Sequence, residues 1–132
     1  NMTNRIKQEI KAPEGGKALN DCLFCQIAAK KIPSQIVFED DQIMAFKDIN
    51  PVAPVHILVI PKKHIPSLAE TSPEDQQLLG LIQVQAARIA VQEGIAEPGY
   101  RLVANTRDDG GQTVGHLHYH LLGGRPMQWP PG

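Results

Sequence analysis

The sequence predicts an α+β domain whose sheet is mainly antiparallel. Five short runs have the composition of strands, but only two segments have helical spacing. Two helices are too few to supply the crossover connections of a fully parallel sheet. The chain has 132 residues, 42% of them hydrophobic, which is enough for one domain with one core. The predicted order is helix, three strands, helix, two strands and a tail.

The first predicted element is a short helix with Asp21 as its N-cap. Phe24, Ile27 and Ala28 follow at helical spacing. The residue before a proline avoids helical geometry, so this segment is expected to end near Ile32-Pro33.

Three strands are predicted next. Two short β-rich runs over 36–38 and 43–46 are separated by the acidic stretch 39–41, a pattern typical of a hairpin. The run Val55–Ile60 is almost continuously apolar and is followed by Pro61, as expected of a central strand.

A longer helix is predicted to begin at Ser72-Pro73, with serine at the cap and proline in the first turn. Gly94 is expected to end it. The apolar residues that share one face of this helix are Leu78, Leu81, Ile82, Ala86 and Ile89.

The last two strands are predicted over Tyr100–Ala104 and Val114–Leu122, with Gly110-Gly111 between them. Three histidines, His116, His118 and His120, alternate within the second of these strands. Alternate side chains share one face of a strand, so the three imidazoles are expected on one face, about 6.6 Å apart. The intervening apolar side chains, expected to enter the core, are Leu117, Tyr119 and Leu121.

Such a row of imidazoles has two chemical interpretations. It could supply metal ligands, although no carboxylate lies within the motif. It could also supply a neutral imidazole nucleophile whose neighbours fix its tautomer. The loop 110–113 just upstream favours the second interpretation, because its backbone N–H groups and polar side chains suit phosphate oxygens. Asn105 adds a further polar contact at the end of the preceding strand.

The motif His116–Leu122 resembles the alternating pattern of the histidine triad superfamily, and further segments resemble its Hint branch, the purine nucleoside phosphoramidases. The match runs in order from Asp21 to Gly132, which defines a HIT-like domain over 21–132 after a polar, flexible arm over 1–20. The other matching segments are Ile36–Asp41, Phe46–Ile49, Pro54–His64, Gly110–Val114, Gly123–Arg125 and Trp129–Gly132.

The resemblance implies hydrolysis of the P–N bond in phosphoramidates of AMP or GMP, with aminoacyl-adenylates as further substrates, and without a required cofactor. His118 resembles the nucleophile that forms a nucleotidyl-histidine intermediate, and His120 resembles the phosphate-contacting third histidine. His116 resembles the first histidine, which orients the others, with His56 close by on a neighbouring strand.

The resemblance also implies a substrate site and a homodimer. Gln112 and Thr113 match contacts to the phosphate and leaving group, and Asp48 matches the carboxylate that binds both ribose hydroxyls. Trp129 belongs to a tail that approaches the partner subunit's active site in Hint relatives. The apolar slot for the purine ring corresponds to Phe24, Ile27, Ile32, Phe46 and Ile49.

The pair Cys22-x-x-Cys25 has two interpretations. In some members of the superfamily a similar pair joins two histidines at a zinc ion, and His64 and His116 correspond to those histidines here. The alternative is a pair of reduced, partly buried thiols.

Composition and charge exclude some partners. The formal net charge of −1 argues against long nucleic acid as a partner. No apolar run approaches the ~20 residues that cross a bilayer. The N-terminal segment has no secretory pattern, so we expect a cytoplasmic protein.

Three functions remain open at this point. Besides the phosphoramidase, the superfamily contains dinucleoside polyphosphate hydrolases and nucleotidyl transferases. The transferases would have Gln where this chain has His120, and the tail from Trp129 fits Hint better than the polyphosphate branch. The third function is a non-catalytic nucleotide sensor or scaffold that retains the pocket.

Overall fold

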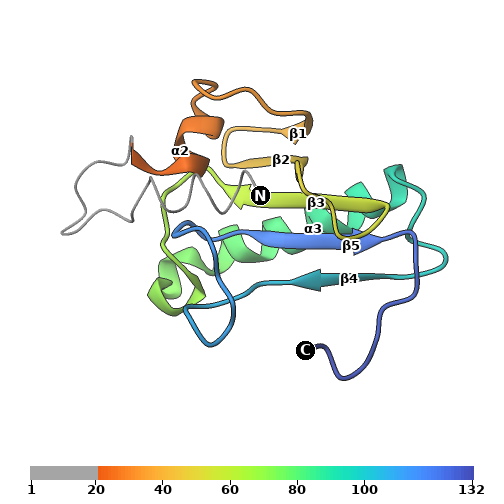
Figure 1. Cartoon of the computed structure of the whole chain (residues 1–132). Helices are drawn as coiled ribbons and strands as arrows, with labels where there is room; N and C mark the ends of the chain where they lie inside the picture. The colour runs from red at the N-terminus through yellow and green to blue at the C-terminus, as the bar shows by residue number, and fades with distance from the viewer. Residues whose placement is uncertain (1–20) are drawn as a thin grey trace.

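The computed structural model describes residues 21–132, and the predicted flexible arm over 1–20 lies outside the described residues. Five strands form one antiparallel sheet in the order β1-β2-β3-β5-β4, with the long helix α3 along one face (Figure 1). The predicted α+β class is therefore confirmed, whereas pairing into a homodimer stays a prediction. The strands are β1 Ile36–Glu39, β2 Ile43–Lys47, β3 Val55–Pro61, β4 Tyr100–Val103 and β5 Tyr119–Gly123.

The predicted hairpin and central strand are both confirmed. β1 pairs with β2, and the turn between them is closed by the Asp40 carboxylate, which accepts the N–H groups of Gln42 and Ile43 at 2.8 Å each. β3 lies between β2 and β5. It extends one residue beyond the prediction, because Pro61 still occupies a position opposite Ile43.

The short helix α2 covers Leu23–Ala28 and is capped differently from the prediction. Cys22, not Asp21, is the N-cap, since its thiol accepts the N–H of Cys25 at 3.4 Å. The helix ends at Ala28, earlier than predicted, and Lys30 soon after has the left-handed φ of 62°.

The long helix α3 covers Gln76–Gln92 and follows the 3₁₀ turn η4, Pro73–Asp75. Ser72 and Asp75 form a reciprocal capping box at its start, as serine at the cap predicts. Gly94 follows the last turn with φ 75°, so the predicted end is also confirmed. A further 3₁₀ turn, η3, covers Leu68–Glu70.

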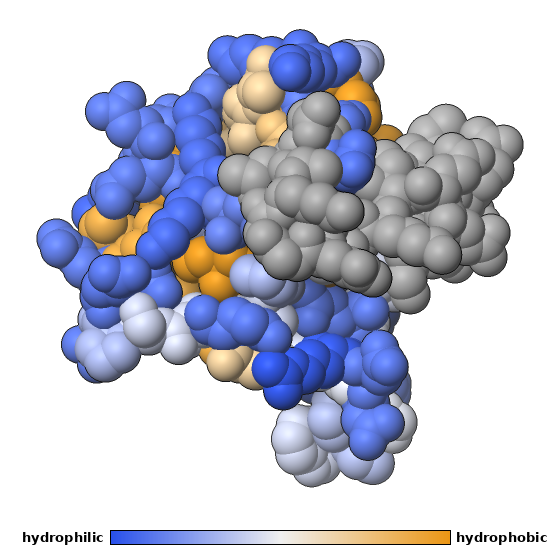
Figure 2. Space-filling model, turned by 90° about the vertical axis from the view of Figure 1, so that its left-hand side faces the viewer, coloured by the Kyte–Doolittle hydropathy of each residue, from blue (hydrophilic) through white to orange (hydrophobic). Residues whose placement is uncertain are grey.

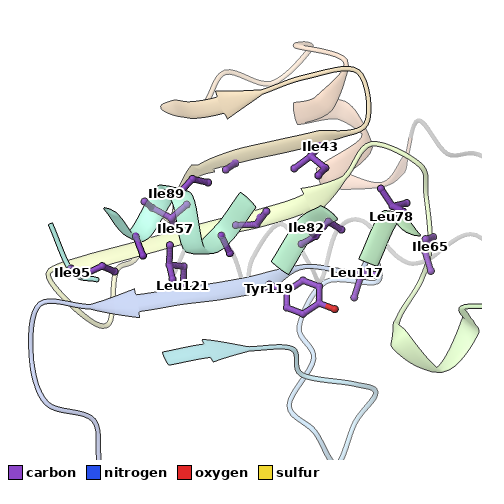
Figure 3. Packing of buried hydrophobic residues seen from close by; sticks show 14 residues of the cluster. Ile43, Ile57, Ile65, Leu78, Ile82, Ile89, Ile95, Leu117, Tyr119 and Leu121 are labelled. Atoms are coloured by element: carbon purple, nitrogen blue, oxygen red, sulfur yellow. The ribbon is translucent and has the colours of Figure 1, made fainter. Parts of the chain in front are cut away.

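The buried face of α3 is narrower than predicted. Leu81 is 40% exposed, because it lies at the edge of the stripe centred on Ile82 and Ala86. Figure 3 shows the packing of α3 against the sheet, with Ile89 near Ile57 and Leu121. The buried residues of α3 are Leu78, Ile82, Gln85, Ala86, Ile89 and Ala90.

The last strand is shorter than predicted, since β5 begins at Tyr119 and not at Val114. Val59 lies opposite Tyr119, so two residues further the same register would place Pro61 opposite Leu117. Proline has no N–H to donate to a ladder. The Leu117 N–H instead bonds the Ile65 carbonyl at 2.6 Å, and the chain leaves the sheet.

The two faces of the sheet separate the hydrophobic core against α3 from the histidine side chains on the α2 side. Ala45 and Val59 belong to the cluster that packs against α3, whereas the alternate residues Phe46 and Leu58 pack with α2. His120 pairs with Leu58 across the β3–β5 ladder, so its side chain lies on the α2 face. As predicted, Leu117, Tyr119 and Leu121 all enter the cluster against α3.

The surface seen in Figure 2 is mostly hydrophilic over the described residues, with hydrophobic residues in separate groups. Among residues 21–132, neither α2 nor α3 has the length and apolar content that a membrane crossing requires.

Candidate active site

Three imidazoles form a cluster on the α2 face of the sheet. The ring centroids of His118 and His120 are 5.0 Å apart, and those of His56 and His120 are 5.1 Å apart. His56 comes from β3 and His120 from the neighbouring strand β5, whereas His118 precedes β5. The tertiary structure thus places His56, which was predicted to lie close by, against the two later histidines of the motif.

His118 is held in one tautomer by the backbone. Its Nδ1–H donates to the carbonyl oxygen of His116 at 2.7 Å. In a neutral imidazole with the proton on Nδ1, the lone pair lies on Nε2. The ring is only 3% exposed, and this burial lowers the pKa of His118 below its usual 6.5. At neutral pH, His118 therefore has an unprotonated Nε2, as a nucleophile requires.

His120 is held in the opposite tautomer. The Val52 N–H donates to Nδ1 of His56 at 3.1 Å, which places the His56 proton on Nε2. That proton points to Nδ1 of His120 at 2.9 Å, so His120 carries its own proton on Nε2. Burial lowers the pKa of His120 to about 4, which keeps the ring neutral. The ring atoms that this network leaves available are therefore the Nε2 lone pair of His118 and the Nε2–H of His120.

Asp48 lies just after β2 and completes this network. Its N–H donates to the His56 carbonyl at 3.0 Å, and its Oδ1 accepts the Asn50 N–H at 2.8 Å. Its Oδ2 lies 3.4 Å from Nε2 of His56. Burial lowers the pKa of His56, although the negative charge of Asp48 opposes this shift.

An apolar pocket of about 120 Å³ lies beside Asp48 between α2 and the strands β2 and β3. All five residues predicted to form the purine slot line it, although Ile49 is 59% exposed. Leu23 and Leu58 also line the pocket and were not predicted, since nothing distinguishes them from core residues in the sequence. The predicted lining residues are Phe24, Ile27, Ile32, Phe46 and Ile49.

Phe24 connects this pocket to the histidines. Its ring meets the His118 ring edge to face at a centroid distance of 5.0 Å and the His116 ring at 5.9 Å. It also contacts Phe46 at 5.6 Å. One aromatic ring therefore forms a wall of the pocket and packs against the candidate nucleophile.

The glycine loop before the motif is held by Gln112. The side-chain amide of Gln112 donates to the carbonyls of Pro66 and Val114 at 2.7 and 2.9 Å and accepts the Arg107 N–H at 2.8 Å. Gly110 packs so closely on the Thr106 backbone that a Cβ there would lie 2.4 Å from its carbonyl oxygen. The phosphate roles predicted for Gln112 and its half-buried neighbour Thr113 stay predictions.

Two predicted site residues lie elsewhere in this chain. Asn105 lines a cleft of about 610 Å³ with Arg101 and Met127 from β4 and the C-terminal tail. Trp129, in the same tail, is 81% exposed. Neither lines the pocket at Phe24, and their roles stay predictions.

His116 lies on the same α2 side of the sheet as the other two histidines, since the Phe24 ring packs on the rings of both His116 and His118, but only His120 belongs to the strand β5 itself. Because the segment leaves the sheet before Tyr119, the fully buried His116 ring turns toward two thiols. Its Nδ1 lies 3.3 Å from the Cys22 sulfur, 3.6 Å from the Cys25 sulfur and 3.2 Å from Nδ1 of His64. We refer to Cys22, Cys25, His64 and His116 as the tetrad.

The tetrad has the ligand set and spacing of a structural zinc site. A zinc ion lies about 2.3 Å from a sulfur ligand and about 2.0 Å from a nitrogen ligand. In a tetrahedral site, a sulfur and a nitrogen ligand are therefore about 3.5 Å apart. The Cys25 sulfur lies 3.3 Å from Nδ1 of His64. Nε2–H of His116 donates to the Pro61 carbonyl at 2.8 Å, which directs the Nδ1 lone pair at the thiols. These residues therefore fit a tetrahedral metal ion.

A second group of metal-ligating atoms occurs among the described residues. Asp48, His56 and His120 also have ligand atoms within 4.8 Å of one another. In this group the facing nitrogens of the two histidines are engaged in the hydrogen bond between them. This group therefore forms a hydrogen-bond network, whereas the tetrad has the arrangement that fits a metal ion.

The fold and this site define a histidine-triad protein. The model of the HIT domain family matches residues 29–127, and the chain belongs to this family.

Relatives of this chain include characterised and uncharacterised proteins. The purine nucleoside phosphoramidase of Escherichia coli K12 is 53% identical over 107 residues, covering 81% of this chain and 90% of the relative. An uncharacterised HIT-like protein of Synechocystis is 52% identical over 112 residues, covering 85% and 97%. The crystal structure of a HIT family hydrolase from Legionella pneumophila is 54% identical, with a TM-score of 0.83, and the match covers 84% of this chain and 99% of that one.

The first prediction concerns imidazole titration in the free protein. We expect His120 to titrate near pH 4, and His56 and His118 below 6.5, because burial favours the neutral rings. The unfolded chain takes up these protons first as the pH falls through 6.5, so stability present above pH 6.5 is lost toward pH 4.

Histidine ¹⁵N NMR spectra recorded between pH 4 and 8 measure these midpoints, and urea midpoints over the same range measure the stability. The chain in urea is the control, with all rings near 6.5. A midpoint at or above 6.5 for His120 in the folded protein would contradict the assignment.

Proposed function

We propose that this HIT family hydrolase is a purine nucleoside phosphoramidase that hydrolyses the P–N bond of AMP and GMP phosphoramidates and also the acyl-phosphate P–O bond of aminoacyl-adenylates. The observation that carries the proposal is the pair of opposed tautomers, an Nε2 lone pair on His118 beside an Nε2–H donor on His120. The similarity to the E. coli phosphoramidase supports the same activity.

The first step transfers the nucleotidyl group to the protein. Nε2 of His118 attacks the α-phosphorus, the P–N bond breaks, and the leaving amine takes up a proton from solvent water. Charge accumulates on the phosphoryl oxygens in the transition state, where the Nε2–H of His120 stabilises it. The His116 carbonyl stabilises the partial positive charge that develops on the His118 ring through its bond to Nδ1.

The second step returns His118 to its starting state. Water attacks the phosphorus of the nucleotidyl-histidine, the P–N bond to Nε2 breaks, the nucleoside monophosphate leaves, and one proton of the water is released to solvent. Because Nδ1 of His118 keeps its proton throughout, the lone pair reappears on Nε2 without rearrangement of the ring.

Substrate binding uses the neighbouring pocket. Its apolar lining suits a purine ring, which presents two flat faces to hydrophobic side chains. Asp48 lies at the same pocket and retains acceptor capacity beyond its bond to Asn50, so it suits the two ribose hydroxyls. Ribose held there orients the α-phosphorus toward His118.

The second prediction concerns the nucleophile. His118→Ala is expected to lower turnover of the fluorogenic tryptamine phosphoramidate of AMP by about 10³ or more, because no covalent intermediate can form. Binding of AMP, measured by calorimetry, is retained and reports that the variant is folded. Turnover near the wild-type rate in the variant would exclude His118 as the nucleophile.

The same assay with diadenosine polyphosphate separates the alternative activities of the superfamily. We expect the wild-type protein to prefer the phosphoramidate. A preference for the polyphosphate contradicts the proposal, as does AMP binding without turnover of either compound, which is expected of a sensor or scaffold.

The third prediction concerns the ribose contact. Asp48→Ala is expected to raise KM for ribonucleotide phosphoramidates by about tenfold or more, as loss of a charged hydrogen bond does, and to affect 2′-deoxy substrates less. Asp41→Ala, at an exposed carboxylate of the β1–β2 turn, is the matched control. Equal losses on both substrates would remove the proposed role of Asp48.

We also infer that the tetrad holds a structural zinc ion. Two thiolates and two imidazoles are a ligand set that zinc favours, and no open coordination position is left for chemistry. Burial and the neighbouring Cys22 raise the pKa of Cys25 to about 12 in the metal-free protein, so zinc binding must displace this proton.

The fourth prediction follows from this site. Elemental analysis of the full chain, purified without added metal, is expected to find about one zinc per chain, because the four ligands complete a tetrahedron. Cys22→Ser/Cys25→Ser removes both sulfur ligands and is expected to contain none. Wild-type protein without zinc that also fails to take it up would contradict the site.

A further inference from the structure

We infer that the tetrad is a positioning element for the nucleophile, so that metal bound by these four residues holds His118 in its attacking tautomer and orientation. The inference builds on the proposed function, because it assigns the orientation of His118 to a second site. It goes beyond a structural zinc ion, since it predicts an energetic link between metal binding and the nucleotide site.

The first connection is His116, which belongs to both sites. Its imidazole faces the thiols through Nδ1, while its carbonyl accepts the Nδ1–H of His118. Nε2 of His116 is bonded to Pro61, and the next N–H, of Leu117, is bonded to Ile65. With a metal on Nδ1, both ring nitrogens of His116 are held, and the carbonyl that selects the His118 tautomer cannot turn away.

The second connection is helix α2. Phe24 lies between the two cysteines in the sequence and packs on the rings of both His116 and His118. A helix of six residues is too short to be stable by its own hydrogen bonds, so its place depends on tertiary contacts. Metal bonds from Cys22 and Cys25 to the two histidines tie this helix, and with it Phe24, to the nucleophile.

Without metal, the four side chains of the tetrad are held together only by weak hydrogen bonds between thiols and imidazoles. Thiols are weak hydrogen-bond donors and acceptors, and the two histidine Nδ1 atoms face each other at 3.2 Å. Only one of two facing nitrogens can carry a proton in a hydrogen bond between them, and a second proton would repel the first. When the metal is removed, the His64 and His116 rings are therefore no longer fixed relative to each other. The backbone of His116, including its carbonyl, gains conformational freedom.

The fifth prediction compares the zinc-loaded full chain with the chelator-treated and the reloaded chain. We expect the His118 Nδ1–H signal in ¹⁵N NMR spectra to weaken or shift when zinc is removed, and kcat for the phosphoramidate to fall about tenfold or more. Reloading restores both, whereas Cys22→Ser/Cys25→Ser does not respond to zinc. Lys63→Ala, whose ammonium contacts Asp75, is the matched control next to His64 and behaves like the wild type.

Circular dichroism establishes whether the metal-free chain is folded. A folded metal-free chain with an unchanged His118 signal and an unchanged kcat overturns the inference. If the metal-free chain unfolds, cobalt in place of zinc tests the link in the loaded protein. AMP is then expected to alter the visible cobalt spectrum and to increase cobalt affinity, because coupling between two sites is reciprocal. A spectrum and an affinity that AMP leaves unchanged overturn the inference.

The failure of the proposed function has a different signature. A zinc-loaded wild type that turns over no phosphoramidate, but whose His118 signal still responds to zinc, contradicts the activity and supports the positioning role. A wild type that turns over the phosphoramidate equally well with and without metal supports the activity and contradicts the positioning role.

Discussion

The site depends above all on one hydrogen bond, from Nδ1 of His118 to the carbonyl oxygen of His116. A carbonyl can only accept, so this bond leaves the reactive lone pair on Nε2. Burial then keeps the ring neutral. The bond joins residues only two positions apart, and its geometry is available because the chain leaves the sheet just before Tyr119. A continuous ladder through this segment would have left the His116 carbonyl to pair with a neighbouring strand.

The sheet allows this arrangement because its two faces differ. One face packs against α3 and supplies the hydrophobic core, while the other faces α2 and carries His56 and His120. The core side chains and the reactive side chains alternate along the same strands, so the core holds the histidines in register. The hydrogen-bond network then crosses from β3 to β5 over a single ladder. The side chains that stabilise the fold and the histidines of the candidate site therefore alternate along the same strands.

Many of the core residues and helix ends were predictable from patterns within short stretches of the sequence. Alternation identified the core residues Leu117, Tyr119 and Leu121, and serine and glycine signals marked the ends of α3. The errors came from non-local contacts. Cys22 replaced Asp21 as the helix cap because its thiol, which also lies 3.3 Å from Nδ1 of the distant His116, accepts the Cys25 N–H. Leu81 fell outside the buried stripe because the sheet covers a narrower arc of α3.

By itself, the sequence determined the class of fold, the order of its elements, the histidine motif and the residues that line the apolar pocket and form the tetrad, since each follows from periodicity or from motif resemblance. Only the tertiary structure decided which imidazole faces which partner. Ring orientation depends on backbone groups of Val52 and Pro61, which carry no side-chain signal in the sequence. A carbonyl or an N–H is common to nearly every residue, so its role becomes visible only when folding brings it to a particular nitrogen.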